Sequence, residues 1–243
     1  MNKVNIVFTH FSNNANMAYA VAAGMVFNFG NMFLAGTISF AGMSVAFPIA
    51  SGAAILVSSI FAVLTGTPHS VVLTLGGCGL VLAAIAIVAY TYSTHQDALA
   101  EAAKVAGMQL DPRSKQAKRA PQPAMAAKAV VLGVLSGIAL GLFRPLVALA
   151  QETDAGVAPY GLALLFAGGI LSTTVVLNPF FFNFPITGGA IRLSNYFRGT
   201  MTQHVQGLLG GVVAAAALLA SFISSGAPTP IRVPLGTAFA VSQ

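Results

Sequence analysis

The stretch from Val4 to Gln96 contains no Lys, Arg, Asp or Glu. Charged side chains make up about a quarter of the residues of a soluble domain. A soluble domain built from this uncharged run would therefore lack the charged side chains that normally solvate a protein surface. A charge at the centre of a bilayer costs at least about 2.5 kcal/mol on insertion scales, which is why membrane-embedded segments avoid charge. The whole chain agrees, because 56% of its 243 residues are hydrophobic and only 7% are charged. The sequence therefore predicts an integral membrane protein.

Six apolar stretches are long enough to cross a membrane as helices, since about 20 apolar residues span roughly 30 Å of hydrocarbon. Helix is the expected state because an unpaired backbone group in lipid costs several kcal/mol. The predicted helices cover residues 17–41, 43–65, 71–92, 129–149, 160–177 and 205–224. The predicted fold class is thus all-α, with three helices in residues 1–92 and three more in residues 129–243.

Residues 93–128 between the two sets of helices form a basic linker. A short helix around residues 96–106 of this linker is compatible with the sequence. Cytoplasmic loops collect Lys and Arg, so we expect this linker on the cytoplasmic side of the cell membrane, that is, of an inner or plasma membrane. There it would contact membrane lipid headgroups. Alternation then puts residues 178–203 inside as well, with eight basic residues inside and two, Lys3 and Arg232, outside. No aromatic residue interleaves the basic run as base stacking would require, which disfavours nucleic-acid binding.

Glycines at four-residue spacing mark two helices as packing surfaces. The fourth predicted helix carries Gly133, Gly137 and Gly141, and the sixth carries Gly207 and Gly211. Helices in lipid associate through small residues that let their backbones approach. We expect these faces to pack against other helices. The alternative role for these glycine faces is to let helices slide during a conformational cycle. Assembly into a homodimer is compatible with the sequence.

Uncharged polar groups gather in the first two predicted helices. Asn28 and Asn31 are three residues apart and share a helical face. Pro48 lies inside the second helix and cannot donate to the carbonyl of Ser44, and such irregular backbone is tolerated where protein or a water-filled cavity covers it. We therefore expect Asn28, Asn31, Ser44 and Pro48 to contact a small neutral polar solute. The alternative is that both amides bond to a neighbouring helix.

Two ionisable groups have competing interpretations. His204 lies at the entrance of the sixth predicted helix, where it either carries protons or faces the headgroups as a capped side chain. Arg144 lies toward the outer end of the fourth, where it either reaches the interface or binds a substrate oxygen or anionic group. The four histidines have no metal-ligand spacing, and no Gly-rich nucleotide loop is present. We therefore expect no metal, no cofactor and no enzymatic activity.

Several short segments resemble the ureide permease and glucose/rhamnose transporter branch of the drug/metabolite transporter superfamily. The resemblance rests on two groups of segments that follow in the same order. The first group is Phe29-Gly-Asn31, Ala41-Gly-Met-Ser-Val-Ala-Phe-Pro48 and Gly52. The second group is Asn178-Pro-Phe-Phe-Phe-Asn-Phe-Pro185, Tyr196-Phe-Arg-Gly-Thr200, Gln203-His204 and Gly207 to Gly211.

The resemblance implies a permease of ten helices in two inverted five-helix repeats, moving a sugar, ureide or nucleobase by alternating access with H⁺ or Na⁺ as the coupling ion. This chain would then correspond to family helices three to eight, with its segment from Pro234 opening the next one. Proton coupling usually needs a carboxylate within a span, and the six predicted spans contain none. An exporter of drug-like or amphiphilic compounds and a non-transporting membrane scaffold are the alternative functions.

Overall fold

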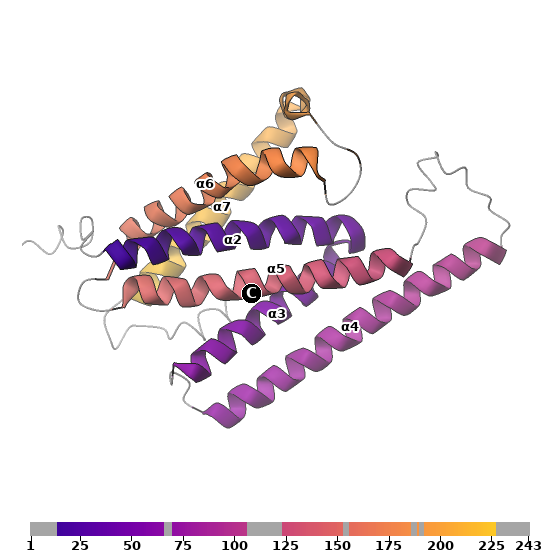
Figure 1. Cartoon of the computed structure of the whole chain (residues 1–243), viewed down its shortest axis with the longest axis horizontal. Helices are drawn as coiled ribbons and strands as arrows, with labels where there is room; N and C mark the ends of the chain where they lie inside the picture. Colours follow the sequence, from indigo (N-terminus) through magenta and orange to yellow (C-terminus); the bar gives the residue numbers. More distant parts are fainter. Residues whose placement is uncertain are drawn as a thin grey trace, which may run out of the picture. The chain divides into compact units, whose positions relative to one another are not determined.

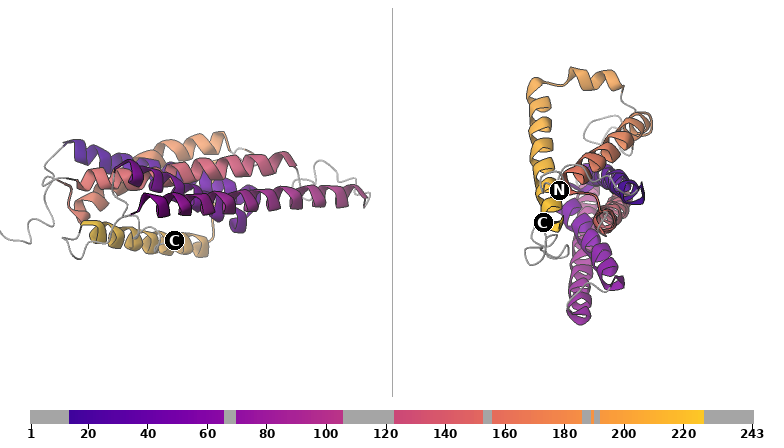
Figure 2. Two further views of the ribbon diagram at one scale, coloured as in Figure 1. Left: turned by 90° about the horizontal axis from the view of Figure 1, so that it is seen from below. Right: turned by 90° about the vertical axis from the view of Figure 1, so that its left-hand side faces the viewer.

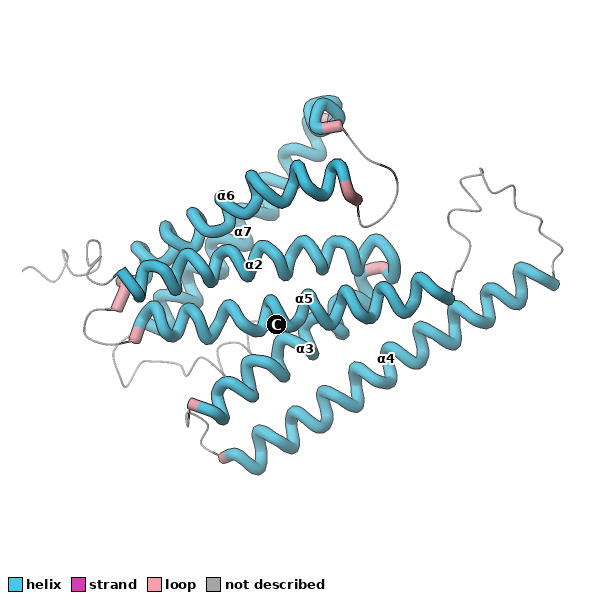
Figure 3. The backbone as a smooth tube through the Cα atoms, in the orientation of Figure 1, coloured by secondary structure: helices cyan, strands magenta, loops and turns pink. Residues whose placement is uncertain are grey.

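The computed structural model describes residues 14–65, 70–105, 123–152, 156–185, 189 and 192–226. Every regular element within these ranges is helical, as the tube in Figure 3 shows. The elements are α2 (Asn14–Ala41), α3 (Met43–Leu64), α4 (Val71–Val105), α5 (Pro123–Gln151), α6 (Pro159–Asn183), the 3₁₀ helix η2 (Leu193–Arg198) and α7 (Met201–Gly226), which are labelled in Figure 1 apart from η2. Lys3, the basic run Arg113–Arg119 and the segment from Pro234 lie outside the described residues.

Each of the six α-helices is long and apolar enough to cross a membrane. The prediction of an all-helical chain with six such helices is therefore confirmed for the described residues. The inverted repeat stays a prediction. The break between the first two helices falls at Gly42, whose φ of 77° lies in the left-handed region that favours glycine.

Helix α4 is longer than predicted. Its 35 residues span about 52 Å at 1.5 Å per residue, well beyond the roughly 30 Å of hydrocarbon. The prediction ended this helix at Tyr92, but alanines and other good helix formers continue the chain into the linker and sustain the helix to Val105. Its apolar stretch runs from Val71 to Leu99, so it takes in the carboxylate of Asp97 near its end.

Helix α6 is also longer than predicted, because it continues through Pro179 to Asn183 rather than ending before the proline. Local contacts support the added turn. The Phe184 N–H donates to the Phe180 carbonyl at 2.8 Å, and the Asn183 side-chain amide donates to the Pro179 carbonyl at 2.8 Å. The rings of Phe180 and Phe184 pack with centroids 5.3 Å apart.

The chain divides into two compact units. We call residues 30–140 the central unit, and residues 1–29 with 141–243 the terminal unit. Helices α2 and α5 each run through both units, because the boundaries fall at residues 29/30 and 140/141.

In the central unit, close approach at glycines brings α3 against two helices. A Cβ on Gly137 of α5 would meet the Ala50 carbonyl, and one on Gly52 of α3 would lie 2.8 Å from the Ile85 side chain of α4. Helix α5 also lies against α2, where the Ser136 hydroxyl donates to the Gly30 carbonyl at 2.8 Å. The central unit is thus held by backbone proximity at small residues, as expected for helices in lipid.

In the terminal unit, four phenylalanines from four helices form the centre of the core. Phe27, Phe143, Phe166 and Phe222 pack with ring centroids between 5.1 and 5.9 Å apart. Such edge-on and tilted ring pairs stabilise the core by more than the burial of their surface area alone. Helices α6 and α7 contact each other near the end of the hairpin opposite η2, and the right-hand view of Figure 2 shows them diverging toward η2.

The directions of the contacting helices agree with successive membrane crossings. Helices α2 and α6 run in the same direction, because the contact of Val21 with Gly169 is followed along both helices by the Asn28–Thr173 bond. Helices α5 and α7 also run in the same direction, from the Arg144–Ser221 bond to the Gln151–Ser225 bond. Contacts between α2 and α5 in the central unit run in opposite senses. Six helices that cross a membrane in alternation produce this pattern, because odd-numbered spans share one direction and even-numbered spans the other.

Candidate functional site

An amide and two hydroxyls meet between α2 and α6 in the terminal unit. The Asn28 Nδ2 donates to Thr173 Oγ1 at 2.9 Å and to Thr174 Oγ1 at 3.2 Å. Asn28 is the fifteenth residue of α2, and Thr173 is the fifteenth residue of α6. Both groups therefore lie near the middle of their helices, about 21 Å from the first residue at 1.5 Å per residue.

The threonine hydroxyls determine which end of the amide faces them. Thr173 Oγ1 donates to the Gly169 carbonyl at 2.9 Å, and Thr174 Oγ1 donates to the Ile170 carbonyl at 2.8 Å. Each hydroxyl has one proton, so both oxygens can only accept from Asn28. The Asn28 amide oxygen consequently points away from the threonines, and no donor among the described residues bonds to it.

The polar cluster lies one turn beyond a glycine crossing of the same two helices. A Cβ on Gly24 would meet the Phe166 carbonyl, and a Cβ on Gly169 would meet the Val21 carbonyl. Asn28 follows Gly24 by four residues, and Thr173 follows Gly169 by four. The glycines therefore bring the backbones close enough for two short polar side chains to bond one turn later.

The other residues of the predicted solute site belong to the central unit. Asn31 is half-buried in α2 and has a polar interaction of its own. Ser44 and Pro48 are exposed in the first two turns of α3. The structure thus brings Asn28 together with Thr173 and Thr174, which the sequence analysis did not single out.

Arg144 is buried inside the terminal unit. It is 8% exposed, its Nη1 donates to Ser221 Oγ of α7 at 2.6 Å, and its guanidinium lies 5.1 Å from the centroid of the Phe143 ring. It precedes the end of α5 at Gln151 by seven residues, about 10 Å. These contacts hold the side chain between α5 and α7.

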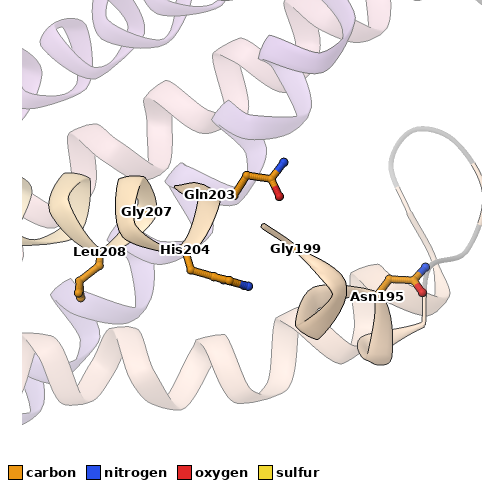
Figure 4. Close-up of a pocket in the computed structure, with 6 residues that line it drawn as sticks. All are labelled: Asn195, Gly199, Gln203, His204, Gly207 and Leu208. Carbon is orange, nitrogen blue, oxygen red and sulfur yellow. The ribbon is translucent and has the colours of Figure 1, made fainter. Parts of the chain in front are cut away.

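His204 is half-buried in the first turn of α7, which is closed by a reciprocal cap. The Thr200 N–H donates to Gln203 Oε1 at 3.0 Å, and the Gln203 N–H donates to Thr200 Oγ1 at 3.4 Å. Figure 4 shows His204 and Leu208 on the same side of α7, near the chain that enters from η2. They line an open hollow of about 690 Å³ together with Asn195, Gly199, Gln203 and Gly207.

The two glycine faces predicted from the sequence have different environments. Gly133, Gly137 and Gly141 are buried, and a Cβ on Gly133 would lie 2.9 Å from Ile49. Gly207 and Gly211 are exposed, and a Cβ on either would meet nothing within 4 Å. Within the described part of this chain, the α7 glycines therefore do not form the packing face that their spacing suggested.

The threonines of the α6 cluster had a weak signal in the sequence. Ser172-Thr-Thr174 is a run of three hydroxyls near the middle of an otherwise apolar helix. Such hydroxyls usually bond back to their own helix, so the run alone does not indicate a partner. The polar partner that distinguishes them is Asn28, which lies 145 residues away from Thr173.

Comparison with known proteins identifies no relative of this chain. No model of a protein family, no curated protein and no solved structure matches the chain. Among the residues that the structure describes, no three His, Cys, Asp or Glu side chains could hold a metal ion together. The interpretation of the site therefore rests on Asn28 and its neighbours in the terminal unit.

Proposed function

We propose that this protein is a secondary transporter that moves a small neutral polar solute across a membrane by alternating access. The observation that carries the proposal is the Asn28 amide oxygen, a hydrogen-bond acceptor near the middle of an apolar helix with no donor among the described residues. Polar groups at membrane depth are costly and commonly mark a transport path. The resemblance of the two segment groups to a permease branch supports the same function.

The chemistry around Asn28 favours an uncharged solute. Its neighbours are hydroxyls and backbone carbonyls, and no charged side chain of the described residues bonds to the cluster. A solute hydroxyl or N–H can donate to the amide oxygen, as a sugar, ureide or nucleobase would. An anion would find no positive charge among these described neighbours to offset its loss of hydration.

Alternating access also requires helices that can bend. The two helices that run through both units each have a weakened position close to the unit boundary in the sequence. Gly30 follows the boundary in α2, and a helical glycine costs about 0.5–1 kcal/mol relative to alanine. Pro145 in α5 cannot donate to the carbonyl of Gly141, the residue that follows the other boundary.

Uptake of labelled solutes into vesicles that contain the protein tests the proposal. We expect uptake of at least one member of a panel of sugars, ureides and nucleobases. In Asn28→Ala the KM for that solute should rise roughly five- to tenfold, the equivalent of one lost hydrogen bond of about 1–1.5 kcal/mol.

A Thr173→Val, Thr174→Val double variant is the matched control. It removes the bonds from Asn28 to the two hydroxyls, retains the 3.5 Å contact of the amide nitrogen with the Ile170 carbonyl, and keeps the Asn28 amide oxygen. It therefore separates loss of the threonine contacts from loss of the solute contact. The KM should rise less in the double variant than in Asn28→Ala at equal protein yield. Absence of uptake across the whole panel would contradict the transporter proposal, and equal KM values in the two variants would contradict the role of Asn28.

A membrane assembly subunit is a second candidate, favoured by one observation. Gly207, Gly210 and Gly211 are exposed on α7, with nothing within 4 Å of a Cβ at any of them. Small residues of this kind suit close contact with another helix. This function predicts a stable protein partner after purification in mild detergent, and a melting temperature that does not change with any solute of the panel.

A further inference from the structure

The hollow at the start of α7 combines hydrogen-bond donors with local positive charge. Gln203 uses its amide oxygen to accept the Thr200 N–H, so the amide nitrogen is the end left to donate outward. Asn195 adds a side-chain amide that can donate, and it lines the hollow together with Gln203 and His204. Arg198 directly precedes the lining residue Gly199 and is exposed.

Within the terminal unit, no described acidic residue lies at this end of α7. From Ala155 to Gln243 the sequence has three arginines and no Asp or Glu. Glu152 is the described carboxylate of the terminal unit, and it follows Gln151, whose side chain bonds to Phe222 and Ser225 at the opposite end of α7. The 26 residues of α7 extend about 39 Å, so the Glu152 end is distant from the hollow.

Next along α7, the helix surface is apolar and exposed among the described residues. Leu208 lines the hollow and is 69% exposed, and Val212 one turn later is 59% exposed. Gly207 and Gly211 leave the backbone accessible between them, with nothing within 4 Å of a Cβ. A ligand that fits this surface has a polar anionic end and an apolar remainder.

We propose that the hollow formed by Asn195, Gly199, Gln203, His204, Gly207 and Leu208 binds the phosphate headgroup of an anionic membrane lipid, whose acyl chain lies along α7. The hollow is open and, at about 690 Å³, has room for a phosphate headgroup. Anionic lipids are attracted to basic residues at the membrane surface, and Arg198 adjoins the lining residue Gly199 in the sequence. Lipid binding here does not depend on solute transport by the Asn28 site.

Titration of the purified protein with lipid, followed by native mass spectrometry, tests the proposal. The probes are phosphatidylglycerol and phosphatidylcholine of the same acyl chains, added to the protein in a neutral detergent. We expect tighter binding of phosphatidylglycerol. Arg198→Gln should weaken that binding about fivefold, the effect of one basic residue near an anionic lipid.

A second variant fills the hollow without changing charge. Gly207→Leu adds a side chain where a Cβ meets no neighbour, so we expect it to fold and to abolish the preference for phosphatidylglycerol. Gly168→Leu on α6 is its control, because that glycine is equally open. Lys128→Gln is the control for Arg198→Gln, because it removes an exposed charge from α5 in the central unit.

Three results would overturn the lipid site. The first is equal binding of the two lipids to the unmodified protein. The second is equal affinity for phosphatidylglycerol in Arg198→Gln, Gly207→Leu and their two controls. The third is displacement of phosphatidylglycerol by inorganic phosphate at the same concentration, which would assign the hollow to a soluble anion.

Discussion

Replacement of Gly169 by alanine should separate α2 from α6 and break the polar cluster above their crossing. A Cβ at this position would lie 3.0 Å from the Met25 backbone nitrogen and 3.1 Å from the Val21 carbonyl carbon, and its closest contact would be the Val21 oxygen. These neighbours are backbone atoms, which cannot rotate away as a flexible side chain does. The helices must therefore move apart to accept the methyl group.

The cost follows from the distances at the crossing. Carbon–oxygen contacts in proteins lie at about 3.3–3.6 Å, so relief of the contact requires a separation of about 1 Å. The Asn28 to Thr173 hydrogen bond of 2.9 Å would then exceed bonding distance. Overpacking costs about 1–3 kcal/mol and an interhelical hydrogen bond in a membrane contributes about 0.6–2 kcal/mol, so we expect a total loss of about 2–5 kcal/mol.

The neighbouring glycine supplies the matched control. A Cβ on Gly168 meets nothing within 4 Å, and alanine is favoured over glycine in a helix by up to about 1 kcal/mol. Thermal unfolding in detergent, followed by circular dichroism, should show Gly169→Ala melting about 5–10 °C below Gly168→Ala. Equal melting temperatures for the two variants would refute the close backbone crossing of α2 and α6.

Two buried hydroxyls of the central unit give further predictions. Ser136→Ala removes the 2.8 Å bond to the Gly30 carbonyl and should lower the free energy of unfolding by about 0.5–1.5 kcal/mol. Ser172→Ala is the control and should change the free energy of unfolding little, because the exposed Ser172 hydroxyl bonds only to the Gly169 carbonyl of its own helix. Tyr92→Phe removes a 3.1 Å bond to a carbonyl at the end of α2 and should cost a similar amount, whereas Tyr90→Phe, 73% exposed, should be neutral. Thermal melts of the four variants in one detergent check both, and equal melts within a pair would contradict the corresponding bond.

The number of helices could be predicted because lipid penalises charge so strongly that the apolar runs stand out in the sequence. The ends of α4 and α6 could not, because different physics determines them. Beyond Tyr92 the helix continues through water-compatible helix formers, where hydropathy no longer reports on structure. At Pro179 the missing backbone donor did not end the helix, since the Asn183 amide and the Phe184 N–H support the following turn.

The candidate site was half predictable for a similar reason. An asparagine within an apolar span stands out, because its desolvation needs compensation by a partner or a ligand. Thr173 and Thr174 satisfy their own protons within α6, so each is unremarkable as a single residue. Only their proximity to Asn28 identifies them, and no local pattern encodes a contact across 145 residues.

Glycine spacing alone does not determine which helices touch. Gly133 and Gly137 on α5 share their four-residue spacing with Gly207 and Gly211 on α7, yet the first pair is buried and the second is exposed. At the crossing of α2 with α6, by contrast, each helix presents a glycine to the backbone of the other and a polar side chain four residues later. This reciprocity places a hydrogen bond where close approach permits it. Because that bond uses only the nitrogen of the Asn28 amide, the crossing both orients the side chain and leaves its oxygen without a donor among the described residues.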